Sequence, residues 1–306
     1  MPIGVSSMSK RYTPIEKAGI TSRQLILILI TAMAVVPGYL MVTGSLKTQA
    51  EFLNSPWSLP MNPNFQGYSA AWNDQFPTWF RNSLLVTLTA VFITIVMAAC
   101  AAWGFAHWKW KGRDTVLGIL ISLMVVPPVV LLIPLFTLGA KLGWISTFRM
   151  LILVYIGLML PFSIYLLTNF FRAIPASLTE AAEIDGASNF RTFRSVVLPL
   201  SGPPLITLTI VNLLWAWNEL LLALVFLQSD EQKTLMVGIT GFQSRYSLSI
   251  PTIMAGMTIA TIPLFITYVF GQRYFITGLT AVQLRGSENG VFSLDKCRRT
   301  SGFSGL

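Results

Sequence analysis

The fold is decided by the stretch "EAAEIDGASNFRTFRSVVLPL" (Glu180–Leu200), a polar element between two apolar segments. It holds three carboxylates, two arginines, a central glycine and a proline. The whole chain is 54% hydrophobic and only 11% charged. A soluble domain usually carries about 25% charged residues. The composition therefore indicates a membrane protein, in which a polar element of this length needs an explanation.

Six apolar segments surround this stretch, and each reaches the length of about 20 residues that a spanning helix needs. They are residues 24–46, 82–106, 116–138, 150–171, 203–227 and 252–275. None alternates as a strand of an outer-membrane barrel does, so we predict an all-α bundle of six transmembrane helices. Basic residues precede the first segment, as in a signal peptide. It is long and no A-x-A site follows, so we interpret it as an uncleaved anchor.

The distribution of Lys and Arg predicts the orientation of these spans. With the N-terminus inside, the inner segments hold fifteen of these residues and the outer segments six. Inner loops of membrane proteins carry the excess of Lys and Arg, so both termini are expected to be cytoplasmic. The same bias explains the net charge of +9 without a nucleic-acid partner. Residues 1–23 form a cytoplasmic segment, 24–286 the membrane domain, and 287–306 a tail expected to be disordered and foreign to the natural chain.

No catalytic or metal centre is expected in this chain. Cys100 and Cys297 lie in an apolar segment and in the tail, and His107 is the only histidine, so no zinc-binding spacing exists. The chain has no G-x-x-x-x-G-K-[ST] motif to cradle a nucleotide, and no nucleophile–base set. We predict a protein that is not an enzyme and that binds no cofactor itself.

The polar stretch predicts a two-helix elbow in the loop at residues 172–202. Pro175 fits the first turn of a short helix that runs through Asp185, and Gly186 can end it with positive φ. Ser188 or Asn189 can cap a second short helix. We expect the apolar side of the elbow to face the bundle and its charges to face the cytoplasm. An ordinary amphipathic loop at the membrane surface is the alternative.

The spacing within the stretch resembles the cytoplasmic motif of permease subunits of ATP-driven, binding-protein-dependent (ABC) importers. That motif is E-A-A, three residues, G, nine residues, I, one residue and L-P. Here it corresponds to Glu180, Ala181, Ala182, Gly186, Val196, Leu198 and Pro199, with valine in place of isoleucine. "AWNELLLALVFL" (Ala216–Leu227), "MAGMTIATIPLF" (Met254–Phe265) and "FGQRYFITGLTA" (Phe270–Ala281) resemble the carbohydrate-uptake branch, in particular the second permease of maltose-type transporters.

The resemblance implies a type I ABC importer permease fold and a subunit that forms half of the pathway for a disaccharide or oligosaccharide. The implied partners are a homologous second permease, an ABC ATPase dimer that binds ATP and Mg, and an extracytoplasmic sugar-binding protein. The implied location is the bacterial or archaeal cytoplasmic membrane. The elbow would dock on the ATPase as a coupling helix through Glu180, Ala181, Ala182, Asp185, Gly186, Phe190, Phe193, Leu198 and Pro199.

Two further groups of residues are candidates for function. Glu219 lies deep in the fifth apolar segment, where an ionisable side chain indicates a functional site. It could line a sugar pathway together with Asn212, Trp215, Trp217 and Asn218, or these side chains could hold helices together. In the outer loop, Gly238, Gly241, Phe242, Gln243 and Tyr246 could contact the binding protein, or the loop could simply be exposed.

Other interpretations of the chain stay open at this level. Pro127, Pro128 and Pro134 interrupt the third segment and could shape a pathway or form a static kink. The solute could be another polar compound, such as glycerol phosphate. An ion-coupled carrier that works alone would need buried acids, and Glu219 is the acid available deep in a span.

Overall fold

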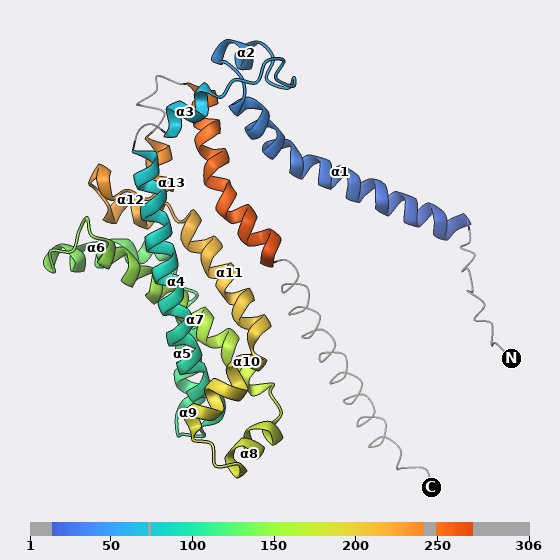
Figure 1. Cartoon of the computed structure of the whole chain (residues 1–306). Helices are drawn as coiled ribbons and strands as arrows, with labels where there is room; N and C mark the ends of the chain where they lie inside the picture. The colour runs from blue at the N-terminus through green and yellow to red at the C-terminus, as the bar shows by residue number, and fades with distance from the viewer. Residues whose placement is uncertain (1–13, 73–74, 242–248, 272–306) are drawn as a thin grey trace, which may run out of the picture. The chain divides into compact units, whose positions relative to one another are not determined.

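A computed structural model of the chain describes residues 14–72, 75–241 and 249–271. These residues form helices, turns and loops (Figure 1). The chain divides into two compact units. One comprises Met1–Ala71 with Tyr246–Thr258, and the other comprises Trp72–Arg245 with Ile259–Leu306.

Four described helices are long and apolar enough to cross a membrane. They are residues 23–45 of α1 (Pro14–Ser45), α4 (Phe76–His107), α7 (Phe148–Arg172) and the last described helix, Ile250–Gly271. Two further pairs of helices pass the same test but are sharply bent, so the described chain has four to six spans. The number agrees with the six segments that hydropathy predicts.

In the first unit, a buried lysine holds the chain that follows α1. Lys47 is 2% exposed, and its Nζ donates to the carbonyls of Ser55 (2.7 Å) and Pro56 (3.1 Å) and to the Ser58 hydroxyl (3.3 Å). These acceptors lie just after α2 (Gln49–Asn54), and α3 (Gln66–Trp72) follows. Because the ammonium has only three donors, the loop satisfies its hydrogen-bonding capacity.

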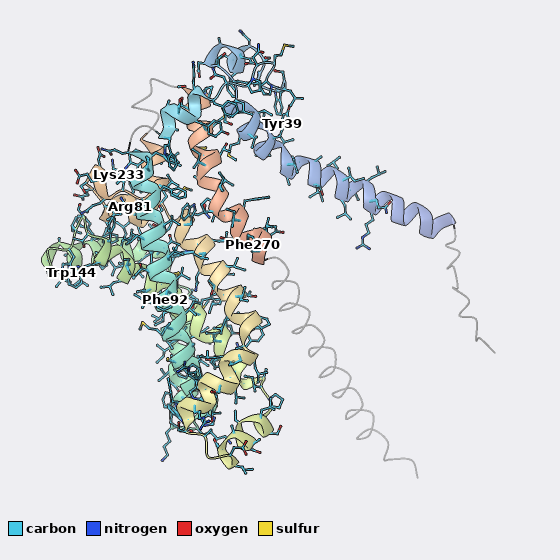
Figure 2. The ribbon with its side chains drawn as sticks, in the orientation of Figure 1. Tyr39, Arg81, Phe92, Trp144, Lys233 and Phe270 are labelled. Carbon is cyan, nitrogen blue, oxygen red and sulfur yellow. The ribbon has the colours of Figure 1, made fainter. Side chains whose placement is uncertain are left out.

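In the second unit, α4 is the central helix. It packs along α7 and against α11 (Gly202–Asn218) (Figure 1). Ala90, Ala98 and Ala102 of α4 are fully buried, and such small side chains let membrane helices approach closely. Tyr155 of α7 is buried in the same hydrophobic cluster as Ala90. Phe92, labelled in Figure 2, is 70% exposed, so one face of α4 remains free for lipid or a partner.

The third predicted span is broken, not merely kinked. It consists of α5 (Arg113–Leu123) and α6 (Pro128–Lys141), which meet at 95°. Pro127 has extended backbone angles and Pro128 opens α6. Neither proline has an N–H to continue the helix, so both favour a break at this point. Pro134 lies inside α6, which continues through it.

The fifth predicted span also breaks, so the prediction of one helix from residue 203 to 227 is wrong. α11 ends at Asn218, and α12 (Leu221–Phe226) starts after two residues. The carboxylate of Glu219 accepts hydrogen bonds from the backbone N–H groups of Leu222 (2.8 Å) and Ala223 (3.0 Å). A carboxylate in this position satisfies N–H groups that the first turn of a helix leaves without partners.

The loop after α12 is fixed to the start of α4. Asn82 Nδ2 donates to the carbonyls of Glu231 (2.8 Å) and Lys233 (3.0 Å), and Lys233 is labelled in Figure 2. Ser83 Oγ accepts from the backbone N–H of Leu235 (2.8 Å), the first residue of α13 (Leu235–Thr240). The base of this loop is therefore part of the packed structure.

Gly238 of α13 provides a test of this packing. A Cβ at this position would lie 2.0 Å from the Trp79 ring, whereas a Cβ at Gly118 of α5 would meet nothing within 4 Å. Because overpacking costs about 1–3 kcal/mol, we expect Gly238→Ala to lower the thermal midpoint of the detergent-solubilised protein by several degrees. Gly118→Ala is the control and should leave it unchanged or raise it. Equal thermal midpoints for the two variants would contradict the close contact between Gly238 and the Trp79 ring.

Candidate functional site

The first half of the elbow is α8 (Ala176–Ile184). It follows Pro175 and ends at Gly186, whose φ is +78°. The N–H of Gly186 donates to the carbonyl of Glu183 (3.0 Å), and that of Ala187 donates to the carbonyl of Ala182 (2.9 Å). These two bonds form a Schellman motif, which needs the left-handed conformation that glycine adopts without strain. The predicted helix and its glycine stop are confirmed.

The surface of α8 differs from the prediction. The helix has no buried residue, and Ile184 is 86% exposed. Leu178, Glu180 and Asp185 are exposed as well. The expectation that the apolar side of the elbow faces the bundle is therefore wrong for α8, whereas the second half of the elbow buries Phe193 and Val197 in the core. This chain leaves aliphatic side chains and acids of α8 uncovered together.

The second half of the elbow is one continuous helical run that changes type. It comprises α9 (Asn189–Thr192), a π-helical segment (Phe193–Val197) and α10 (Leu198–Leu200). Ser188 caps it as predicted, because its hydroxyl accepts from the N–H of Arg191 (3.4 Å). In the π-helical part, the N–H of Leu198 donates to the carbonyl of Phe193, five residues back.

This run ends at Leu200, one residue after Pro199, and the chain then turns by 76° into α11. The N–H of Ser201 donates to the carbonyl of Val197 (3.0 Å), and its hydroxyl donates to the same carbonyl (2.8 Å). Pro199 lies in the first turn of α10, where its missing N–H is tolerated.

The two phenylalanines of the elbow have opposite environments. Phe190 is 70% exposed, whereas Phe193 is 6% exposed. The Phe193 ring stacks on Trp103 (5.8 Å between centroids) and meets Phe171 edge-on (6.3 Å). The structure therefore corrects the expectation that Phe193 enters a partner, because this ring is already packed in its own chain. Leu198 is half-buried and Pro199 is exposed.

Three of the five candidate pathway residues hold helices together. Asn212 Nδ2 donates to Ser163 Oγ of α7 (3.1 Å), and Trp217 Nε1 donates to the carbonyl of Ala260 (3.2 Å). Glu219 accepts from the Tyr155 hydroxyl (2.8 Å) in addition to the two backbone N–H groups of α12. The geometry favours the interhelical interpretation for these three.

Trp215 and Asn218 remain available to a solute. Asn218 is exposed and donates to the Leu214 carbonyl of its own helix (2.8 Å). Trp215 is 36% exposed and lies edge-on to Tyr155 (5.4 Å between centroids). It lines a cavity of about 490 Å³ between α6 and α7. The other lining residues are apolar apart from Trp144, so the cavity offers few of the hydrogen bonds that a sugar requires.

The predicted contacts of the outer loop are only partly described. Gly238 is buried against Trp79, and Gly241 is half-buried at the end of α13. Phe242, Gln243 and Tyr246 lie outside the described residues. Within the described ranges, no group of three or more His, Cys, Asp or Glu side chains could hold a metal ion.

Two contacts of the site were not predicted from the sequence. Tyr155 is the partner of Glu219, and His107 lies 3.7 Å from Glu183 through Nε2 and Oε1. A tyrosine in the middle of an apolar span is a usable signal, because a buried hydroxyl needs a partner. The identity of that partner depends on which helices meet, and one sequence does not give this.

Comparisons with known proteins agree with this geometry. Residues 90–280 match the family described as the binding-protein-dependent transport system inner membrane component. A Caldicellulosiruptor sp. protein described as an ABC transporter permease is 38% identical, over 84% of this chain and 94% of that protein. The trehalose/maltose transport system permease protein of Thermococcus litoralis is 32% identical, over 85% of this chain and 94% of that protein.

Solved structures extend the likeness to the fold. A chain from the crystal structure of a bacterial ABC transporter involved in the import of the acidic polysaccharide alginate superposes with a TM-score of 0.76. The two sequences are 23% identical, and the superposition covers 87% of the present chain and 100% of the chain from the alginate transporter. The described helices thus have the type I importer permease fold. The chain belongs to the family of inner membrane components of binding-protein-dependent transport systems, and is a multi-pass transport permease subunit.

Proposed function

We propose that this chain is one of two permease subunits of an ATP-driven importer for a disaccharide or oligosaccharide. It forms half of the translocation pathway, and its elbow docks on a separate ATPase subunit. The observation that carries the proposal is the elbow itself. It has the spacing of the family motif, a glycine in left-handed conformation between its helices, and an apolar and acidic surface that its own chain leaves uncovered.

The proposed orientation puts the elbow and both termini in the cytoplasm, following the excess of Lys and Arg on that side. ATP and Mg bind to the ATPase dimer, because this chain has no phosphate-binding loop motif. An extracytoplasmic binding protein delivers the solute to the opposite side. One similar structure is that of a bacterial alginate ABC transporter in complex with an alginate pentasaccharide-bound periplasmic protein, which supports this kind of partner.

Relatives support the sugar class of the solute. Their names include a trehalose/maltose permease and a melibiose/raffinose/stachyose import permease from Bacillus subtilis, which is 30% identical over 82% of this chain. The ion-coupled alternative gains no support, because the Glu219 carboxylate is occupied by Tyr155 and by the first turn of α12. The whole complex, reconstituted in liposomes and tested with labelled trehalose, maltose, melibiose and raffinose, tests the class directly.

Phe190 tests docking of the elbow. Burying a phenylalanine at an interface contributes about 1.5–3 kcal/mol, so Phe190→Ala should weaken the affinity for the ATPase roughly tenfold to hundredfold. Titration of labelled ATPase against the permease pair in nanodiscs measures this affinity. Phe92→Ala is the matched control, because Phe92 is also 70% exposed but lies on α4. Equal affinities of both variants would refute docking through this ring.

Gly186 tests transmission through the elbow. Its φ of +78° is costly for other residues, by roughly 1–2 kcal/mol, and more for a branched one. We expect Gly186→Val to reduce ATP-driven sugar uptake at least about tenfold while the protein still inserts in the membrane, and Gly186→Asn to retain much more uptake.

Gly143 is the matched control for this variant. Its φ is +67°, and a Cβ there would also meet nothing within 4 Å, but it lies in the turn between α6 and α7. Gly143→Val introduces the same backbone strain away from the elbow and should leave uptake within about twofold of wild type. Normal uptake by Gly186→Val, or equal losses in both variants, would argue against a role for this turn in coupling.

Trp215 tests the pathway. As an exposed indole in a span it can stack on a sugar ring, so Trp215→Ala should raise the KM of uptake about tenfold, the equivalent of 1.4 kcal/mol, with little change in the ATP used per sugar. Glu219→Ala should instead reduce the yield of folded protein, because it removes three hydrogen bonds. Unchanged KM in Trp215→Ala would remove this residue from the pathway.

A further inference from the structure

A column of aromatic rings joins the elbow to two membrane helices. His107, the last residue of α4, stacks on Trp103 one turn earlier, with 4.3 Å between ring centroids and 15° between planes. Trp103 stacks on Phe193 of the elbow at 27°, and Phe193 meets Phe171 of α7 at 73°. Both angles belong to favourable aromatic geometries. The column therefore passes from α4 through the elbow to α7 without interruption.

The free half of the elbow meets the same column. Glu183 of α8 lies 3.7 Å from His107 through its carboxylate, and it is half exposed. α8 has no buried residue, whereas the second half of the elbow is anchored by buried Thr192, Phe193 and Val197. Among the contacts between acidic and basic side chains of the described residues, Glu183–His107 is the one that links α8 to a membrane helix.

The two contacts differ in what they can transmit. An exposed polar contact contributes little to stability even when both partners are charged, so Glu183 can orient α8 but cannot bear much load. Stacked rings in a close-packed interior have no free volume in which to slide, so a displacement of one ring displaces its neighbour. Because α4 packs along both α7 and α11, a displacement that reaches its elbow end also reaches the core of the unit.

We propose that Trp103 and His107 are positioning residues of the transport cycle: the Trp103–Phe193 stack passes the displacement of the elbow to α4, and His107 keeps α8 aligned with it. This inference rests on the proposed function, since it needs an ATPase that moves the elbow. It adds residues of α4, outside the elbow motif, to the coupling machinery. Neither residue touches the solute in this proposal.

The test uses the complete complex in liposomes and measures the ratio of ATP hydrolysed to sugar imported. The substrate is whichever of trehalose, maltose, melibiose and raffinose the wild-type complex imports fastest. We expect Trp103→Leu to raise this ratio at least fivefold and Trp103→Phe to stay within twofold of wild type. Phe105→Leu is the matched control. Phe105 is also a buried aromatic residue at the elbow end of α4, but its ring packs on Trp110 (5.7 Å) instead of the elbow.

A purely structural role makes a different prediction. If Trp103 only stabilised the fold, Trp103→Leu and Phe105→Leu would lower the thermal midpoint alike, and the ratio of ATP hydrolysed to sugar imported would be equal in both variants. That result would overturn the proposal. An unchanged ratio in Trp103→Leu would do the same. Should Trp103→Leu fail to fold, the His107 variants decide. His107→Leu and His107→Phe both remove the group that faces the Glu183 carboxylate, so each should raise the ratio at least threefold. Ratios near that of wild type in both variants refute the inference.

The outcomes separate the inference from the proposed function. A wild-type complex without ATP-driven uptake of any of the four sugars refutes the proposed function, and this role with it. A wild-type complex that couples ATP to uptake, with variants that couple equally well, refutes the inference alone. The affinity of each variant for the ATPase, measured in nanodiscs, should stay within twofold of wild type, because Trp103 and His107 lie behind the docking surface. A loss of affinity in Trp103→Leu equal to that in Phe190→Ala would place Trp103 in docking instead.

Discussion

The structure depends on one constraint, which is that a helix broken inside a bilayer must satisfy its own backbone groups. The break between α11 and α12 meets this constraint with a single side chain. The Glu219 carboxylate accepts from two N–H groups of α12 and from the Tyr155 hydroxyl, so it closes the break and ties it to α7. The break between α5 and α6 meets the constraint differently, because Pro127 and Pro128 have no N–H to leave without a partner.

These breaks divide the second unit into parts with different tasks. α4, α7 and α11 form a packed centre with small and aromatic side chains between them. The elbow continues into α11 through the turn at Ser201, so the two share one run of backbone. The proposed docking surface on α8 is therefore connected to the proposed pathway residue Trp215 through the second half of the elbow and the 17-residue helix α11.

The sequence predicted most of the architecture, because its signals are local. Runs of apolar residues mark the spans, and Gly186 and Ser188 mark the ends of the elbow helices. The errors have a common physical origin. Hydropathy is the same for a straight span and for a broken one, so the breaks after Leu123 and Asn218 were not visible to it. The apolar residues of α8 predicted burial, but in a subunit they can equally await a partner.

The side-chain contacts of the site could be predicted least. Glu219 was recognised as unusual from its position in a span, yet its partner Tyr155 comes from a helix 64 residues away in the sequence. Likewise, Phe193 carries no local mark that distinguishes it from Phe190, although one is buried and the other is exposed. The difference arises from the helices that meet at Phe193, because Trp103 of α4 and Phe171 of α7 pack against its ring.

The uncovered surface of α8 has a consequence for the biogenesis of the complex. In the proposed complex, the ATPase covers this surface together with Phe190 of α9. Exposed apolar groups such as Leu178 and Ile184 are recognised by chaperones and proteases or lead to aggregation. Under the proposed function, surplus copies of this permease are therefore expected to be short-lived in the cell, and matched synthesis of the motor subunit protects the permease by covering this face.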